Sequence, residues 1–223
     1  MSFISVQALS KTYHLSQSRS VKALDRVSFD IHQGTWCVIN GPSGSGKSTL
    51  LGLLSVLDRP TSGKILLEGR EIGFAPDVYL ARLRRERFGV VFQEYCLMEQ
   101  LTAYENVAQP LVPMTLTGKE RYQRAMHLLA RVGLEDRALH LPCQLSGGEQ
   151  QRVAFARALV CNPEIIFADE PISNVDLVSA GKLTDLFKSL RKQGCTLVIV
   201  SHDPALSEPA DVCLKLDKGK III

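Results

Sequence analysis

Residues 41–49 read Gly-Pro-Ser-Gly-Ser-Gly-Lys-Ser-Thr, a spacing of glycines, lysine and hydroxyls that can hold a phosphate chain. The stretch fits the pattern G-x-x-x-x-G-K-S/T, in which successive backbone N–H groups fold inward around an anion. The pattern predicts that Lys47 reaches the outer phosphates and that Ser48 holds Mg²⁺. The candidate phosphate-binding residues, called the phosphate loop below, are Gly41, Pro42, Ser43, Gly44, Ser45, Gly46, Lys47, Ser48 and Thr49.

The residues on either side of the phosphate loop favour the same interpretation. Residues 35–40 form a short apolar run typical of a strand, and residues 49–57 form an apolar run typical of a helix. A phosphate site of this kind needs that context, because the helix N-terminus adds positive potential to the loop. The alternative, a glycine-rich turn that matches by chance, is disfavoured by both flanking elements.

Two acids end a second apolar run. Residues 164–168 have the composition of a strand and are followed by Asp169 and Glu170. In a parallel sheet the carboxyl ends of the strands face the ligand crevice, so both acids are expected beside the phosphate loop. Asp169 is then a candidate Mg²⁺ ligand, acting through water, and Glu170 a candidate general base. The alternative is that these acids end the strand because they are solvated there.

A second possible anion site lies at residues 145–152, which read Leu-Ser-Gly-Gly-Glu-Gln-Gln-Arg. Ser146 is a favourable N-cap, and Gly147 and Gly148 expose N–H groups at a helix start. A capped turn without a ligand is the alternative. Two such helix starts, about 100 residues apart, raise the hypothesis that two copies face each other. Each copy would then offer this segment to the nucleotide of its partner.

The elements that must position these residues alternate along the chain. Strands are expected at residues 3–9, 23–31, 35–40, 65–69, 88–92, 164–168, 195–201, 212–216 and 220–223. Helices are expected at 77–85, from residue 117 to Gly133, at 147–160 and at 178–192. This alternation predicts an α/β fold with a mainly parallel, helix-covered sheet. A helical block at about residues 95–158 interrupts it and is interpreted as an inserted subdomain.

The composition is that of an ordinary globular chain. Of 223 residues, 45% are apolar and 22% charged, and the net charge of +3 is too small to indicate nucleic acid binding. Six cysteines show no C-x-x-C spacing and no plausible histidine ligand, so no metal other than Mg²⁺ is expected. Several fall in apolar segments, which suits buried, reduced thiols. The sequence shows no export leader and no run long enough to cross a bilayer, so any membrane anchor is expected from another protein.

The order of the motifs resembles the nucleotide-binding subunit of an ABC transporter. The resemblance runs from residue 3 to the end of the sequence and is carried by GPSGSGKST, Gln93, LSGGEQQR, IIFADEP, SNVD and SHD. It implies a P-loop NTPase (RecA-like) core with an N-terminal antiparallel β subdomain and an inserted α-helical subdomain. Residues 1–223 would be a single ATPase domain. Within it, 1–94 and 159–223 would form the core and β subdomain, and 95–158 the helical subdomain.

The resemblance also implies a homodimer, because in this family two subunits enclose two ATP molecules head to tail. The residues that would meet the γ-phosphate held by the other subunit, called the signature segment below, are Ser146, Gly147, Gly148 and Glu149. Asp176, in Ser-Asn-Val-Asp, resembles the loop that crosses the dimer seam. ATP and Mg²⁺ are the implied cofactors.

Three further residues acquire roles through the resemblance. Gln93 resembles the glutamine that touches Mg²⁺ and water and senses the membrane partner. His202 resembles the switch histidine on the γ-phosphate, and Tyr13 the aromatic that stacks on adenine. Without the resemblance, these residues are a polar strand end, a capping or core histidine and a strand aromatic. The implied catalytic set is Lys47, Gln93, Glu170 and His202, and the implied Mg²⁺ ligands are Ser48, Gln93 and Asp169.

The wording of residues 88–93 and 101–111 resembles the lipoprotein-releasing and macrolide-exporting group. This implies an ATPase peripheral on the cytoplasmic face of the inner membrane, held there by an integral membrane permease that exports lipoprotein, peptide or drug. Residues 94–106 would form much of the groove for the permease's cytoplasmic helix. An importer subunit, for example for amino acids, and a soluble ABC protein acting in repair or on the ribosome are the alternatives. The departures Ile172 and Val175 remove no group needed for hydrolysis.

Overall fold

A mostly parallel sheet forms the centre of the computed structural model, which describes residues 2–14, 16, 19–173 and 175–222. Its strands are β3 Trp36–Asn40, β6 Phe88–Val91, β7 Ile165–Asp169, β8 Thr196–Val200, β9 Val212–Asp217 and β10 Lys220–Ile222. They lie in the order β10-β9-β3-β8-β7-β6, and only the β9–β10 pair among them is antiparallel. The parallel strands β3, β7 and β8 are almost continuous apolar runs, as expected where both faces are covered.

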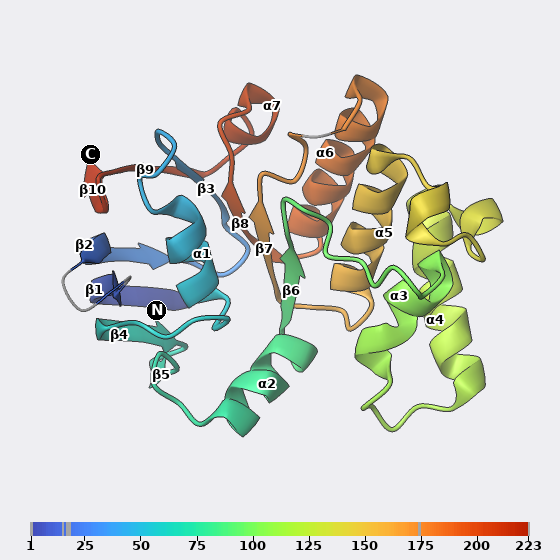
Figure 1. Ribbon diagram of the computed structural model, residues 1–223, viewed down its shortest axis with the longest axis horizontal. Helices are drawn as coiled ribbons and strands as arrows, with labels where there is room; N and C mark the ends of the chain where they lie inside the picture. The colour runs from blue at the N-terminus through green and yellow to red at the C-terminus, as the bar shows by residue number, and fades with distance from the viewer. Residues whose placement is uncertain (1, 15, 17–18, 174, 223) are drawn as a thin grey trace.

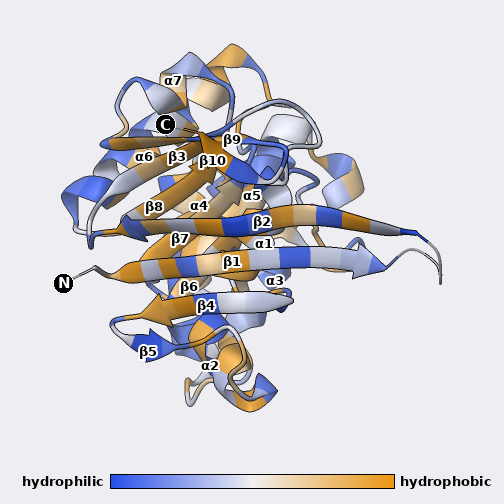
Figure 2. Ribbon diagram, turned by 90° about the vertical axis from the view of Figure 1, so that its left-hand side faces the viewer, coloured by the Kyte–Doolittle hydropathy of each residue, from blue (hydrophilic) through white to orange (hydrophobic). Residues whose placement is uncertain are grey.

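A second, antiparallel sheet packs against the first. It contains β1 Ile4–His14, β2 Ser20–Ile31, β4 Ser62–Leu67 and β5 Arg70–Glu71, in the order β2-β1-β4-β5. Figure 2 shows apolar and polar residues mixed along β1 and β2, whereas β7 and β8 are mainly apolar. β1 runs well beyond its expected end at residue 9, because the polar residues that follow still pair with the start of β2. Tyr13, for example, lies opposite Val21.

Helices cover both faces of the six-stranded sheet (Figure 1). On one face, α1 Lys47–Leu54 and α2 Asp77–Glu86 pack with the antiparallel sheet. On the other lie α3 Ala103–Ala108, α4 Gly118–Arg131, α5 Gly147–Leu159 and α6 Leu177–Lys192. Neighbouring residues of β3 point to opposite faces, so Cys37 joins the first core and Trp36 the second. In the second core the rings of Phe155 and Phe187 meet edge to face at 4.8 Å.

Capping side chains explain where three of the helices begin. Thr102, Thr117 and Ser146 each accept a hydrogen bond from the N–H of a glutamate three residues on, whose carboxylate accepts one in return. The helices expected at 77–85, 147–160 and 178–192 lie within one residue of those bounds. The shorter helices are η1 Gln109–Leu111, η2 Glu135–Arg137, η3 Pro142–Gln144 and α7 Pro204–Ser207.

The first helix of the expected helical block is α3, and the block is preceded by a turn at Tyr95 and Cys96, whose φ values of 35° and 48° are left-handed. Of the cysteines, Cys37 and Cys195 are buried and Cys161 is half-buried, as expected for several of them, whereas Cys96, Cys143 and Cys213 are exposed. None of the helices in the described residues is long and apolar enough to cross a bilayer.

A substitution of Gly89 on β6 tests how tightly α5 packs against the sheet. A Cβ at this position would lie 2.5 Å from the carbonyl oxygen of Ala158 on α5 and 2.5 Å from Cδ1 of Ile166. We expect Gly89→Ala to lower the free energy of unfolding by about 1–3 kcal/mol, since backbone and a packed side chain must move. Chemical denaturation measures this value.

Gly181→Ala is the matched control, because a Cβ at Gly181 on α6 meets no atom within 4 Å. Alanine is the better helix former, so this variant should gain up to about 1 kcal/mol. Equal stability changes in the two variants would contradict the packing described for β6 and α5.

Candidate functional site

The ends of four parallel strands meet at one edge of the six-stranded sheet. The phosphate loop follows β3, Gln93 follows β6, Asp169 and Glu170 end β7, and His202 follows β8. Together with Tyr13 of β1 they line a cavity of about 760 Å³. The expected site residues that line it are Tyr13, Gly41, Ser43, Gly44, Gly46, Lys47, Ser48, Thr49, Gln93, Asp169, Glu170 and His202. Pro42 and Ser45 belong to the same loop, and Ser45 is buried.

The phosphate loop needs glycine where its neighbours approach most closely. Gly41 has φ 149°, and a Cβ there would lie 2.0 Å from the carbonyl oxygen of Leu216 on β9. Gly46 has φ 104°, and a Cβ there would lie 2.4 Å from the carbonyl oxygen of Ala23. The turn between β9 and β10 braces the loop as well, because the N–H of Gly219 donates to the carbonyl oxygen of Ser45 at 2.9 Å. These contacts fix the loop as a rigid backbone cradle.

Lys47 places its charge over this cradle. Its Nζ donates to the carbonyl oxygens of Gly41, at 2.8 Å, and Pro42, at 3.0 Å. A phosphate oxygen is a stronger partner than a carbonyl oxygen for an ammonium group, because the bond is then charge-assisted on both sides. The side chain is therefore held where an anion in the cavity would take over one of its hydrogen bonds.

Asp169 is a half-buried acid of the site. Burial raises the pKa of its carboxyl group, as does the charge of Glu170, while a hydrogen bond with Ser48 and the charge of Lys47 act in the opposite direction. Its Oδ1 atom is buried and has no hydrogen-bond partner among the described residues. An unpartnered carboxylate oxygen beside a serine hydroxyl fits a hard cation such as Mg²⁺, which prefers oxygen ligands. Gln93, from the next strand, adds an amide to the same cavity.

Glu170 and His202 form the polar pair of the site. Nδ1 of His202 lies 2.9 Å from Oε1 of Glu170, and Ser201 donates to Oε2 at a longer 3.4 Å. The backbone of Glu170 has φ 43°, a strained value for a residue with a side chain, and its N–H donates to the carbonyl oxygen of Val200 at 2.8 Å. The carboxylate is thus fixed at the cavity wall with one oxygen engaged by imidazole and the other lightly held.

The segment after Gln93 is held from α5. The half-buried guanidinium of Arg157 donates to the carbonyl oxygens of Tyr95, at 2.9 Å, and Cys96, at 2.5 Å. Its pKa is lowered by burial. Both residues have a left-handed backbone, so Arg157 stabilises the turn that follows Gln93.

The signature segment lies elsewhere in the chain. Ser146 accepts a hydrogen bond from the N–H of Glu149 at 3.3 Å, and Glu149 accepts one from the N–H of Ser146 at 2.8 Å. Asp176 caps α6 by accepting from the N–H groups of Val178 and Ser179, both at 3.0 Å. A Cβ on Gly148 would lie 3.0 Å from Oδ2 of Asp176, so these two parts touch. Within the described part of the chain, neither Asp176 nor any signature residue (Ser146, Gly147, Gly148, Glu149) lines the cavity.

The cavity also contains residues that the sequence reasoning missed. These are Val21, Lys22, Ala23, Ser173, Val200, Lys218 and Gly219. Lys218 and Gly219 had a detectable signal, since they lie between the strands expected at 212–216 and 220–223. The residues of β2 had none, because they reach the site only through the pairing of β2 with β1 beyond residue 9.

Sequence and structure comparisons show the family and the fold of the chain. The family model described as "ABC transporter" matches residues 24–173. An ABC transporter ATP-binding protein of Thermotoga maritima is 46% identical over 211 residues, which cover 95% of this chain and 90% of that protein. The macrolide export ATP-binding/permease protein MacB of Vibrio parahaemolyticus is 42% identical, but the match covers 98% of this chain and only 33% of MacB.

Solved structures match over nearly the whole chain. A dimeric, post-hydrolysis structure of the ATP-binding cassette MJ0796 bound to ADP and Pi has a TM-score of 0.93 and 38% identity. The match covers 99% of this chain and 97% of that one. A second dimeric structure of MJ0796 gives the same TM-score with 39% identity. These likenesses confirm the α/β fold with an antiparallel β subdomain that the sequence predicts.

The half-buried charge of Asp169 generates a stability prediction. Because its pKa is raised, the folded protein binds this proton more tightly than the unfolded chain does, so ionisation above that pKa destabilises the fold. Asp169→Asn should therefore melt at a higher temperature than the wild type at pH 7.5 in chelator, by about 2–4 °C for each kcal/mol relieved. The gap should shrink as the pH falls towards the pKa of Asp169.

Thermal unfolding followed by circular dichroism measures both effects. Asp185→Asn on α6 is the control, since Asp185 is exposed and pairs only with Lys188 at 3.5 Å, and its melting temperature should not change. A lower melting temperature for Asp169→Asn in chelator would show that the carboxylate is satisfied within the fold.

Proposed function

Because the chain belongs to the ABC transporter family, as an ATP-binding subunit with ATPase activity, we propose that the cavity at the strand ends is its hydrolytic site. The observation that carries this proposal is the convergence of the phosphate loop, Gln93, Asp169, Glu170 and His202 on one cavity. Phosphoryl transfer depends on positioning and charge neutralisation more than on covalent chemistry. The cavity supplies N–H donors, a lysine, a half-buried carboxylate and a fixed base within one wall.

In this proposal the phosphate loop binds the triphosphate through its N–H groups, and Lys47 neutralises the outer phosphates. Ser48, Asp169 and Gln93 would hold Mg²⁺, which would supply positive charge to offset the negative charge on the phosphates. The base of the nucleotide lies against Tyr13, whose ring lines the same cavity. The phosphate loop, Lys47 and Ser48 follow β3, whereas Gln93 follows β6, and Asp169 and Tyr13 lie on β7 and β1.

Glu170 acts as the general base for the attacking water. Oε1 already contacts His202 at 2.9 Å, whereas Oε2 has only the 3.4 Å contact from Ser201, so Oε2 is the oxygen that accepts the water proton. His202 orients the carboxylate through Nδ1. A phosphate oxygen bound at Nε2 at the same time requires the doubly protonated ring, because neutral imidazole has a single N–H.

The working form is a homodimer in which the signature segment of one copy closes the site of the other. Two observations support this arrangement. Within the described residues the signature segment does not line its own chain's cavity, and the closely similar MJ0796 cassette forms dimers. ATP would favour the closed dimer because both copies bind its γ-phosphate, and ADP would lose those contacts.

The subunit drives an exporter or force-transmitting complex at the cytoplasmic face of the inner membrane, with lipoprotein, peptide or drug as cargo. Support comes from MacB, whose name describes macrolide export and which joins an ATP-binding part to a permease. Here the permease would be a separate subunit. Its cytoplasmic helix would occupy a hollow of about 250 Å³, which is lined by residues of α2, β6, α5 and η1 and by Phe92. Cys96 is the residue of the expected groove, 94–106, that lines this hollow among the described residues.

We expect Glu170→Gln to lower ATP turnover by about 100-fold or more, because the amide cannot accept the proton of water. ATP binding should persist, and the variant should elute as an ATP-dependent dimer in size-exclusion chromatography. Glu164→Gln, at the other end of the same strand segment and paired with Arg87 at 2.5 Å, is the matched control and should hydrolyse ATP normally. Hydrolysis near the wild-type rate in Glu170→Gln would remove the base assignment.

Native cysteines provide the test of the permease site. In a complex with the membrane protein encoded by the neighbouring gene, expected to have four spans and a large extracytoplasmic domain, Cys96 should react with maleimide at least about tenfold more slowly than in the free subunit. Cys213, exposed on β9, should react equally in both samples. Unchanged labelling of Cys96 in the purified complex would place the permease on another surface, and a substrate-binding protein gene beside the permease gene would favour import.

A further inference from the structure

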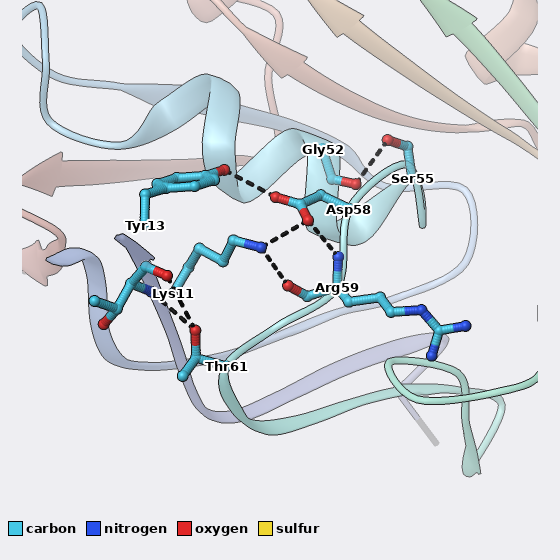
Figure 3. Close-up of polar contacts among 8 residues, drawn as sticks. Lys11, Tyr13, Gly52, Ser55, Asp58, Arg59 and Thr61 are labelled. Carbon is cyan, nitrogen blue, oxygen red and sulfur yellow. Dashed lines mark hydrogen bonds and ion pairs between the residues drawn. The ribbon is translucent and has the colours of Figure 1, made fainter. Parts of the chain in front are cut away.

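The ring of Tyr13 is held at its hydroxyl by an ion pair, and the same hydroxyl also interacts with the side chain of Thr49 in the phosphate loop. Its hydroxyl donates to Oδ2 of Asp58 at 2.9 Å, and Nζ of Lys11 donates to Oδ1 of the same carboxylate at 2.6 Å (Figure 3). The Lys11 ammonium lies 4.8 Å from the centre of the Tyr13 ring, a cation–π distance. The side chains of Tyr13, Asp58 and Lys11 thus hold one another in place beside the cavity.

Asp58 belongs to the segment that follows the phosphate-loop helix. Its Oδ1 accepts a hydrogen bond from the N–H of Arg59 at 2.7 Å, and Lys11 also donates to the Arg59 carbonyl oxygen at 2.7 Å. A few residues on, Thr61 accepts from the N–H of Thr12 at 3.0 Å. The end of β1 is therefore fastened to the segment after α1 (Figure 3), and the aromatic ring is positioned relative to the phosphate loop.

The charge on Asp58 fixes the direction of these bonds. Burial raises the pKa of its carboxyl group, but hydrogen bonds from Lys11, Tyr13 and the Arg59 N–H outweigh this and leave the pKa below its usual value. Asp58 is thus an acceptor at neutral pH, and the Tyr13 hydroxyl must be the donor. A donor bound to a fixed acceptor loses the freedom to rotate with its ring.

Only one face of the ring remains for a ligand. The Lys11 side chain runs along the other face (Figure 3). The free side belongs to the cavity, where Val21 is the cross-strand neighbour of Tyr13. Tyr13 is 37% exposed and Val21 45%, so both side chains are accessible to a ligand in the cavity that they line. Together they form a platform of the kind on which a flat nucleobase stacks.

We propose that Asp58 and Lys11 are positioning residues that fix the Tyr13 ring so that the nucleobase of a nucleoside triphosphate stacks on its free face, beside Val21. The proposal rests on the proposed nucleotide site. A ring that samples other rotamers binds the base only in the fraction of molecules with the correct orientation, and the apparent affinity falls by that fraction. Releasing the ring therefore weakens binding of the base and leaves binding of the phosphates unchanged.

Isothermal titration in chelator, where no hydrolysis occurs, separates the two parts of the ligand. The probes are ATP and inorganic tripolyphosphate, which lacks base and ribose. We expect Tyr13→Ala to weaken ATP binding by about 10-fold or more, and Asp58→Ala by about 3- to 10-fold, with tripolyphosphate affinity unchanged in both. Asp58→Asn should recover part of the loss, because an amide oxygen still accepts from the Tyr13 hydroxyl. In the Tyr13→Ala background, Asp58→Ala should cost nothing further.

Asp77→Ala is the matched control, since Asp77 pairs with Arg59 at 2.7 Å and does not contact Tyr13. If Asp58→Ala is too unstable to titrate, the affinities of Lys11→Met and Asp58→Asn for ATP and tripolyphosphate are compared instead. An equal loss for ATP and tripolyphosphate in the Asp58 variants would overturn the inference, because Asp58 would then support the phosphate-loop helix. Wild-type protein that binds ATP no better than tripolyphosphate would also overturn it, while leaving the phosphate site in place. Protein that binds neither probe would overturn the proposed function itself.

Discussion

Parallel pairing of β3, β8, β7 and β6 is the constraint on which the other features depend. Parallel strands all have their carboxyl ends at the same edge of the sheet, so the loops that follow them lie side by side around one cavity. A phosphate loop, an amide, two acids and a histidine, which are scattered between residues 41 and 202, become neighbours for this reason alone. The backbone hydrogen bonds of the sheet fix where these residues lie, and the side chains then provide the charges and hydrogen-bonding groups of the site.

Much of this was predictable, because each active segment combines a strong local signal with a simple rule of packing. The phosphate loop is fixed by its glycines, whose positions at Gly41 and Gly46 allow no side chain. Asp169 and Glu170 follow a strand that is apolar enough to be recognised, and the helix at Ser146 begins with a capping box that is readable three residues ahead. In each case, residues close together in the sequence are enough to identify the element, and the parallel sheet then places it at the site.

What the sequence left open depends on pairing between segments that carry no local signal. The extension of β1 to His14 places Tyr13 and Val21 side by side, yet the residues there are polar enough to read as a loop. The role of Asp58 follows from contacts to β1 made across some forty-five residues of chain. The left-handed turn at Tyr95 and Cys96 likewise receives two hydrogen bonds from Arg157, a residue far along the chain. Polar contacts between residues far apart in the chain produce no periodic pattern in the sequence, so they cannot be predicted from it.

The brace from Gly219 to Ser45 has a consequence for how the protein matures. The phosphate loop lies early in the chain, but one of the hydrogen bonds that shapes it comes from a turn made some 170 residues later, and β9 fills the sheet position beside β3. While the chain is still emerging from the ribosome, the loop therefore lacks its final support. The final shape of the nucleotide site is therefore complete only after the late hairpin has been synthesised and has paired with β3.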